Sequence, residues 1–295
     1  MNRLKNIIAC IGYEFVKKIV RYPSVYSIEE TLNHILISNC SVTRYGDGEI
    51  KWIYNLKQNS FQNNNDSMSR KLKEILVKRR TNRNVIICIP EFFNGVSQFN
   101  NSASLYYKKH LLKDGKFWRR LLDYHCKYYN ADITRPYIDY KDKDRSENIF
   151  GTWKKIFKDR NILMVEGANT RFGVGNDLLN DAKSVKRIIC PSQNAFNKYT
   201  NIKESIIEAS KSINDPLVLI ALGPTATILS YDLSEYNLQV IDIGHTDLEY
   251  EWYLRRSVYK EPIKGKVVNE LGEKPSESLD FKDQKFNREI IKKIL

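Results

Sequence analysis

The stretch "PLVLIALGPTATILSYDL", Pro216 to Leu233, sets the structural pattern of the chain. Its first half is continuously apolar, which is typical of strands that are buried on both faces of a parallel sheet. Gly223 and Pro224 end this run, and a helical segment begins near Thr225. The stretch therefore predicts a strand–turn–helix unit of an α/β protein.

Similar β-branched runs occur at residues 40–45, 84–90, 161–167, 185–191 and 238–244. Helical or loop segments separate them. The segment 66–80 is one such helix, with these apolar residues on one face: Met68, Leu72, Ile75 and Leu76. Another helix is expected to start near Asn176. We therefore predict an α/β fold with a doubly wound, mostly parallel sheet.

The chain divides into three parts by composition. Residues 1–35 form an amphipathic helix and lead-in, residues 36–260 hold the predicted sheet, and residues 261–295 form a polar extension with a short last helix. Within the middle part, about residues 92–150 are aromatic and basic and contain no sheet-like run. We interpret them as a helical insertion that covers a binding site or presents a basic face to a partner; a plain helical layer of the core is the alternative.

The chain carries a formal net charge of +13, from 48 Lys and Arg against 35 Asp and Glu. This excess favours an anionic partner: nucleic acid, an acidic membrane surface or a phosphorylated small molecule. A composition set by an AT-rich genome would give the same charge. No RRM, KH or helix-turn-helix pattern accompanies the charge, so we expect no nucleic-acid partner.

The cysteines and the first helix bear on the compartment. The five cysteines show no CxxC spacing, which favours buried, reduced thiols and a cytoplasmic protein. Glu14, Lys17 and Lys18 interrupt the first apolar segment, so we expect neither a signal peptide nor a spanning helix. Its apolar residues recur at helical spacing: Ile7, Ile8, Ile11, Phe15 and Ile19. This helix lies on a membrane surface or packs on the domain.

The motif "RYGDGE", Arg44 to Glu49, lies where the run at 40–45 ends. On an extended chain, side chains two positions apart share a face, and the intervening glycine permits a tight turn. Asp47 and Glu49 can then converge on one cation or on sugar hydroxyls. Two such carboxylates and a diphosphate would make a Mg²⁺ or Mn²⁺ site, whereas a solvated turn is the structural alternative.

The turn at Gly223, Pro224 and Thr225 has the features of a phosphate site. A helix that begins there directs unpaired N–H groups and its positive dipole end toward the sheet edge. An ordinary strand-to-helix turn would have the same sequence.

A second strand end, in "LMVEGANTRFGVGNDLL" at residues 163–179, is built in a similar way. The strand ends in Glu166 and Gly167, and the loop after it carries Arg171. That side chain can bind a phosphate or a carboxylate bidentately. The loop is neither a Walker A motif nor a dinucleotide fingerprint.

Titratable residues cluster after the last predicted strand, in "VIDIGHTDLEYEW": Asp242, His245, Asp247, Glu249 and Glu251. So many ionisable groups at one strand end favour a functional site, although His245 is also compatible with a structural, hydrogen-bonded role. In a helix that starts at Asp247, Asp247 and Glu251 lie on one face.

Five blocks in order, "RYGDGE", "MVEGANTRFGVGNDLL", "CPSQNAF", "ALGPTATILSYDL" and "IDIGHTDLEYEW", resemble the bacterial glycosyltransferases of the GT-D fold, once labelled a domain of unknown function. The resemblance covers about residues 41–256. It implies a Rossmann-like enzyme that uses a UDP-sugar and a divalent metal, with Asp47 and Glu49 in the D-x-E metal motif.

This resemblance assigns expected roles to the candidate residues. Arg44, Tyr45 and Gly46 would bind the donor, together with the two strand-end sites described above; the metal would be Mn²⁺ or Mg²⁺. A base would take the proton of the acceptor hydroxyl, and Glu251, Asp247 and His245 are the candidates. The acceptor would be a glycan, a lipid-linked saccharide or a glycoprotein. Apart from the resemblance, the basic N-terminal helix and the basic insertion predict contact with the inner face of an anionic membrane.

Other classes of protein remain as alternatives. A Rossmann-like methyltransferase could hold an adenosyl group at Glu166 and Gly167. A basic nucleic-acid-binding protein would use the aromatic and basic insertion. A non-catalytic sugar- or nucleotide-binding scaffold would keep the sheet but would not need the carboxylates.

Overall fold

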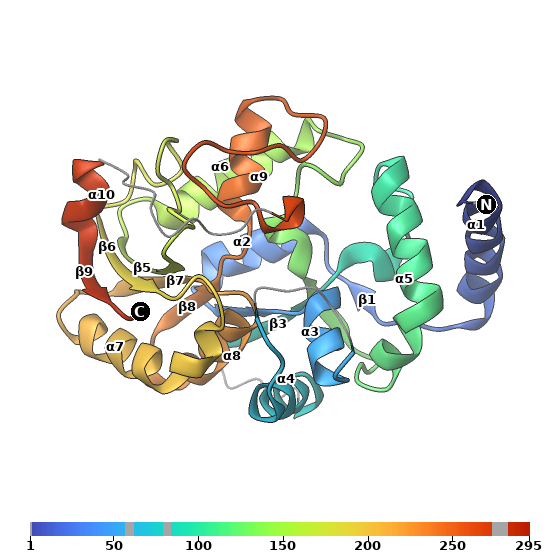
Figure 1. The fold of residues 1–295 in the computed structure, drawn as a ribbon, viewed down its shortest axis with the longest axis horizontal. Coiled ribbons are helices and arrows are strands. Elements are labelled where there is room, and N and C mark those ends of the chain that lie inside the picture. Colours follow the sequence, from blue (N-terminus) through green and yellow to red (C-terminus); the bar gives the residue numbers. More distant parts are fainter. Residues whose placement is uncertain (1, 57–61, 79–83, 273–282) are drawn as a thin grey trace.

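The computed structural model describes residues 2–56, 62–78, 84–272 and 283–295. In these residues nine strands form one sheet (Figure 1). They are β1 (Ser24–Val25), β2 (Ser41–Arg44), β3 (Val85–Ile89), β4 (Lys127–Asn130), β5 (Asn161–Gly167), β6 (Ser184–Cys190), β7 (Pro216–Ala221), β8 (Gln239–Asp242) and β9 (Ile290–Lys293). All six predicted runs are strands, because each is apolar enough to be covered on both faces.

The strand order is β1-β4-β3-β2-β8-β7-β5-β6-β9, and every pair is parallel. Strands β3 and β4 lie on one side of β2. Strand β8 lies on the other side of β2, followed by β7, β5 and β6. The order therefore reverses between β2 and β8. Loops that leave these two strands diverge and open a crevice at their carboxyl ends.

Helices cover both faces of the sheet (Figure 1). They are α1 (Asn2–Ile19), α2 (Ile28–Ser38), α3 (Asp47–Ile53), α4 (Asp66–Lys78), α5 (Asn101–Arg119), α6 (Arg145–Phe157), α7 (Tyr199–Lys211), α8 (Pro224–Leu233), α9 (Thr246–Leu254) and α10 (Gln284–Glu289). Helices α4, α7 and α8 pack together on one face, and α2 and α6 pack together on the other. The predicted helix at 66–80 is confirmed as far as Lys78, with its apolar face buried; residues 79 and 80 lie outside the described residues.

Two expectations about elements are wrong. The segment at 92–150 is not purely helical, because β4 lies within it and pairs with β1 and β3. No helix starts near Asn176, since residues 168–183 form successive turns. In that loop Arg171, Gly173 and Gly175 have φ of 51°, 73° and 83°, which a helix does not permit. Of the C-terminal extension, residues 273–282 lie outside the described residues; α10 and β9 follow them.

The first helix, α1, packs along α5 at one end of the molecule (Figure 1). Ala9 and Tyr13 are buried, but the apolar residues on the other side of the helix remain exposed. Among the described residues, no helix combines the length and the apolar character needed to cross a bilayer.

Candidate active site

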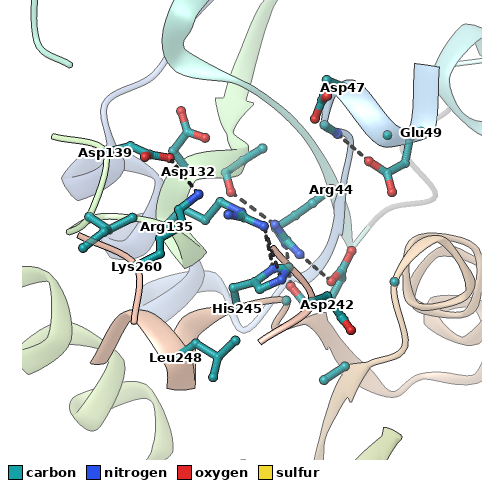
Figure 2. Close-up of a pocket in the computed structure, with 18 of the residues that line it drawn as sticks. Arg44, Asp47, Glu49, Asp132, Arg135, Asp139, Asp242, His245, Leu248 and Lys260 are labelled. Atoms are coloured by element: carbon teal, nitrogen blue, oxygen red, sulfur yellow. Dashed lines mark hydrogen bonds and ion pairs between the residues drawn. The ribbon is translucent and has the colours of Figure 1, made fainter. Parts of the chain in front are cut away.

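A cavity of about 750 Å³ lies at the carboxyl ends of the central strands, among them β2, β4, β7 and β8. It is lined by the segments that follow these strands and by part of α5. The reversal of strand order between β2 and β8 falls in its floor, which is where open α/β sheets bind their ligands. Figure 2 shows the charged side chains around it.

Arg44 holds three of these segments together. Its Nε donates to the backbone oxygen of Asp242 (2.8 Å), its Nη2 to the Asp242 carboxylate (2.7 Å), and its Nη1 to the backbone oxygen of Ala131 (3.4 Å). Gly244, with φ of 47°, lies against the guanidinium: a Cβ there would be 2.0 Å from Nη2. Only glycine fits this position.

The strand of the "RYGDGE" motif ends at Arg44, but Asp47 and Glu49 do not lie on an extended chain as expected. They belong to the first turn of α3, because the Glu49 carboxylate accepts from the Gly46 N–H (2.7 Å) and so caps the helix. Asp47 accepts from Lys51 Nζ and from the Tyr106 hydroxyl, each at 2.6 Å. Both carboxylates nevertheless line the cavity (Figure 2).

The two carboxylates differ in their tendency to ionise. Burial raises the pKa of Glu49 to about 7. Burial acts in the same direction on Asp47, but the Lys51 ammonium and the Tyr106 hydroxyl outweigh it and lower the pKa of that group. At neutral pH Asp47 is an anion, whereas Glu49 is partly protonated and would ionise beside a bound cation.

The opposite wall holds residues that the sequence analysis did not single out. Asp132, Arg135 and Asp139 follow β4, and Lys260 Nζ lies 3.9 Å from the Asp139 carboxylate. Burial raises the pKa of Asp132 to about 7. Asp132, like Asp47, is an acidic residue shortly after a strand. It was missed because the sequence "KYYN" was not predicted to be a strand.

His245 lies in the cavity as expected, next to Arg135 (Figure 2). The Nη2 of Arg135 is 2.9 Å from His245 Nδ1. The same Nη2 lies 3.3 Å from His245 Nε2, so it approaches both ring nitrogens.

Several predicted donor residues also reach the cavity. Gly167, Gly223 and Pro224 line it, and Pro224 is the first residue of α8. Thr225 does not line it, but its hydroxyl is buried at the same helix start and has no hydrogen-bond partner among the described residues. Tyr45 also lines the cavity, but its hydroxyl donates to the Leu72 oxygen at 2.9 Å.

Glu166 and Arg171 are not brought to this cavity. Glu166 is fully buried, pairs with Arg187 at 2.6 Å and accepts from the Phe172 N–H at 2.7 Å. Arg171 donates to the Gly265 oxygen at 2.6 Å and lines a smaller cavity of about 270 Å³. Glu166 lies within β5, and the alternation of the strand points its side chain into the core. The left-handed backbone at Arg171 turns the loop, so the side chain of Arg171 points toward the smaller cavity.

Asp247 and Glu251 share one face of α9, as predicted, but both are ion-paired. Lys266 Nζ lies 2.6 Å from the Asp247 carboxylate and 3.1 Å from that of Glu251, and all three side chains are buried. Asn176 Nδ2 donates to both carboxylates, each at 2.8 Å. Asp247 lies on the cavity wall, whereas Glu251 lines the smaller cavity. These contacts favour a role in holding the loop 168–183.

The cavity thus joins cationic groups, carboxylates and a helix start. Arg44, Arg135 and Lys260 suit an anionic ligand, and α8 begins at the same cavity with the positive end of its dipole. The carboxylates of Asp47, Glu49 and Asp132 suit a cation and the hydroxyl groups of a sugar. In the described residues no group of three or more His, Cys, Asp or Glu is arranged to hold a metal ion.

Comparison with known proteins identifies relatives with the same fold. The chain is 35% identical over 277 residues to a probable glycosyl transferase, Gly, of Streptococcus gordonii, and 34% identical over 286 residues to the glycosyltransferase GlyD of Streptococcus pneumoniae. These matches cover 92% and 97% of this chain but 39% and 34% of the relatives, so the chain spans little more than a third of their length.

Solved structures match over nearly the whole chain. A domain described as having a distinct glycosyltransferase fold superposes with a TM-score of 0.87 at 33% identity, over 97% of this chain and all of that one. A protein described as a new glycosyltransferase from Streptococcus sanguinis gives a TM-score of 0.84 at 32% identity, over 93% of this chain and all of that one. The sequence profile of the glycosyltransferase GT-D fold matches residues 42–271. The chain therefore belongs to the GT-D fold family of glycosyltransferases.

Proposed function

We propose that this protein transfers a sugar from a UDP-sugar to an acceptor hydroxyl, with a divalent cation at the donor diphosphate. The observation that carries the proposal is the cavity between β2 and β8. There the carboxylates of Asp47 and Glu49 lie in one space with Arg44 and the start of α8. This arrangement offers oxygen ligands to a cation and N–H groups to phosphate oxygens.

The residues present fit Mg²⁺ or Mn²⁺ as part of a shared site. Asp47 and Glu49 supply hard oxygen donors, and burial raises the pKa of Glu49 to about 7, so a bound cation would favour its ionised form. Protein sites for these cations commonly use one or two carboxylates, with substrate phosphates and water as the other ligands. A bound cation would stabilise the charge that develops on the leaving diphosphate.

In the proposed transfer the bond between the anomeric carbon and the diphosphate oxygen breaks, and a bond from the acceptor oxygen to that carbon forms. The acceptor proton passes to a base. Asp132 suits this step because it lines the cavity and has a pKa near 7. His245 also lies in the cavity, whereas Asp247 and Glu251 are already paired with Lys266.

We propose a glycan, a lipid-linked saccharide or a glycoprotein as the acceptor, and the cytoplasm as the compartment. The five cysteines, all within the described residues, form no disulfide, as expected for a reducing environment. The alternatives of a methyltransferase and of a nucleic-acid-binding protein receive no support from the family match.

The test is release of free nucleotide from a panel of nucleotide sugars with Mn²⁺. We expect turnover with UDP-sugars and its loss in EDTA. Asp47→Asn and Glu49→Gln should each reduce turnover by about 100-fold or more, because each removes a charged ligand of the cation that would stabilise the leaving diphosphate. Both variants should remain folded, since neither side chain belongs to the apolar core.

Asp66→Asn is the matched control. Asp66 also begins a helix, α4, but it is exposed and lies outside the cavity. Near-normal turnover of the Asp47 and Glu49 variants with unchanged metal dependence would contradict the proposal.

A further inference from the structure

Helix α1 exposes a row of large apolar side chains that no other part of the described chain covers. Leu4, Ile7, Ile8, Ile11, Phe15 and Ile19 are each 50% to 66% exposed, and we call them the apolar stripe. Their spacing places them on one side of the helix. Exposure of six large apolar side chains to water is unfavourable in free energy, so the stripe indicates a surface that binds a partner.

The other side of α1 is firmly attached. Ala9 and Tyr13 are buried where α1 packs on α5. Lys109 Nζ on α5 donates to Asn6 Oδ1 at 2.7 Å, and Lys108 Nζ lies 5.7 Å from the centre of the Tyr13 ring. The stripe therefore faces outward from a fixed helix at the end of the molecule (Figure 1).

Basic residues are frequent on α1 and on the helix that holds it, α5. The exposed ones on α1, just after it and on α5 are Lys5, Lys17, Lys18, Arg21, Lys109, Lys113, Lys116, Arg119 and Arg120. The acidic residues on these two helices are Glu14, which is exposed, and Asp114, which is buried. The surface thus combines an apolar row with a strong excess of positive charge.

We infer that the apolar stripe docks this protein on an anionic lipid bilayer, with α1 lying in the interface. A helix in that position buries its apolar side among the acyl chains, and basic residues beside it contact lipid phosphates. A second copy is a poorer occupant. A two-fold contact through the same stripe would bring Lys17, Lys18 and Arg21 of both copies together with few carboxylates to pair with them.

This surface is independent of the proposed transfer but lies close to it in the fold. The same helix α5 that holds α1 also carries Tyr106, which lines the cavity. Docking through α1 would therefore leave α5 between the bilayer and the cavity.

A tryptophan at position 15 provides the test. The four native tryptophans, Trp52, Trp118, Trp153 and Trp252, are at most 5% exposed, so Phe15→Trp adds the indole that senses the surroundings of the stripe. With the full chain and vesicles of phosphatidylglycerol and phosphatidylcholine, we expect a blue-shifted emission and quenching by lipids brominated on the acyl chains. High salt or pure phosphatidylcholine should weaken both signals.

Substitutions in the Phe15→Trp background distinguish the two parts of the surface. Ile8→Gln with Ile11→Gln should abolish quenching, whereas Ile37→Gln, at an 82% exposed position of α2, should not. Lys17→Gln with Lys18→Gln should weaken binding about fivefold per lysine. The same change at Lys155 and Lys158, exposed on or beside α6, should have no effect.

Three results would overturn the inference. The first is no quenching at low salt with anionic vesicles. The second is equal loss of binding in the matched controls, which would indicate non-specific attraction to the net charge of +13. The third is a blue-shifted emission without vesicles from a dimer that Ile8→Gln with Ile11→Gln makes monomeric, which would assign the stripe to a second copy. None of these readouts depends on glycosyl transfer.

Discussion

Arg44 illustrates how one side chain can fix the relative positions of strands that are distant in sequence. The Arg44 side chain contacts Asp242 on β8 and Ala131 after β4. The backbone oxygen of Arg44 accepts a hydrogen bond from the Thr227 hydroxyl at 3.0 Å. Gly244 is part of the same arrangement because it leaves room for the guanidinium.

Gly244→Ala should disrupt the cavity floor. The new Cβ would meet Arg44 Nη2 and would also sit on a left-handed backbone, so Arg44 must move. We expect the free energy of unfolding to fall by about 1–3 kcal/mol, measured in urea, and nucleotide release to fall more than about tenfold. Gly151→Ala is the control: Gly151 is helical with no atom near its Cβ position, so that change should not destabilise the protein and should leave nucleotide release unchanged.

Asp132 predicts a pH dependence of turnover. A base must be deprotonated, and burial raises the pKa of this carboxyl to about 7, so kcat at saturating donor should rise with pH and level off above about 7. Asp132→Asn keeps an oxygen that can accept from the Glu91 N–H, and it should lose about 100-fold or more in kcat. Asp139→Asn, on the same wall, is the control and should keep the rise of kcat with pH. If Asp132→Asn also keeps this rise, the base is another residue.

Among the elements, the loop 168–183 depends most on contacts from outside itself. It contains no helix or strand, and its Gly173 N–H and Asn176 side chain both donate to Asp247 on α9. Lys266 neutralises Asp247 and Glu251 from a third segment. The loop shape that borders the cavity is therefore fixed by one buried ion-pair network.

Lys266→Met should destabilise the protein strongly. It leaves two carboxylates buried without their cation, and breaking a buried ion pair in this way costs about 3–5 kcal/mol. Thermal and urea unfolding would measure the loss. Lys264→Met, at an exposed position two residues away, should change stability by no more than about 0.5 kcal/mol. Equal effects of the two changes would rule out the network as the cause.

The elements that the sequence failed to predict are those whose stability comes from neighbours. Strand β1 has two residues, and β4 ("KYYN") and β9 ("IIKK") carry polar or charged side chains. The composition of these three segments does not predict strands. They are strands because their backbone groups pair with a neighbouring strand: β1 with β4, β4 with β3, and β9 with β6. The capping contact of Glu49 explains the helix at α3 in the same way: it is a local hydrogen bond that periodicity does not register.

For the whole molecule, buried carboxyl groups predict a fall in stability as pH rises. Burial raises the pKa of Glu49, Asp132 and Glu249 each to about 7. A raised carboxyl pKa means that the folded state binds the proton more tightly than the unfolded chain, so its contribution is present below the unfolded pKa and is lost as pH rises through about 7. We expect a loss on the order of 1 kcal/mol per group between about pH 6 and pH 8.

Glu249→Gln offers a check on that slope. Glu249 is buried outside the cavity, and one of its oxygens accepts from the N–H groups of Tyr137 and Ile138, each at 2.9 Å. Glutamine can keep these two bonds but does not titrate, so the variant should show a flatter dependence of unfolding free energy on pH. A slope unchanged in the variant would exclude Glu249 as a contributor.

The candidate site was predictable in position more than in detail. The carboxyl ends of buried strands can be read from apolar runs, and this placed Arg44, Asp47, Glu49, Gly223 and His245 at the cavity. The direction of each side chain after its strand depends on turns that the sequence does not specify. Arg171 therefore faces a different cavity, whereas Glu166 lies within β5 and the alternation of that strand points it into the core.

The order of the strands also sets the distance between the two ends of the chain. Strand β1, which follows α1, forms one edge of the sheet, and β9, which ends two residues before the last residue, forms the other (Figure 1). Nine strands at about 4.8 Å spacing separate these edges by roughly 38 Å. Two fluorescent proteins, one fused to each end of the chain, would therefore lie well apart, with the cavity between them. Such a pair would give energy transfer that reports on the width of the sheet.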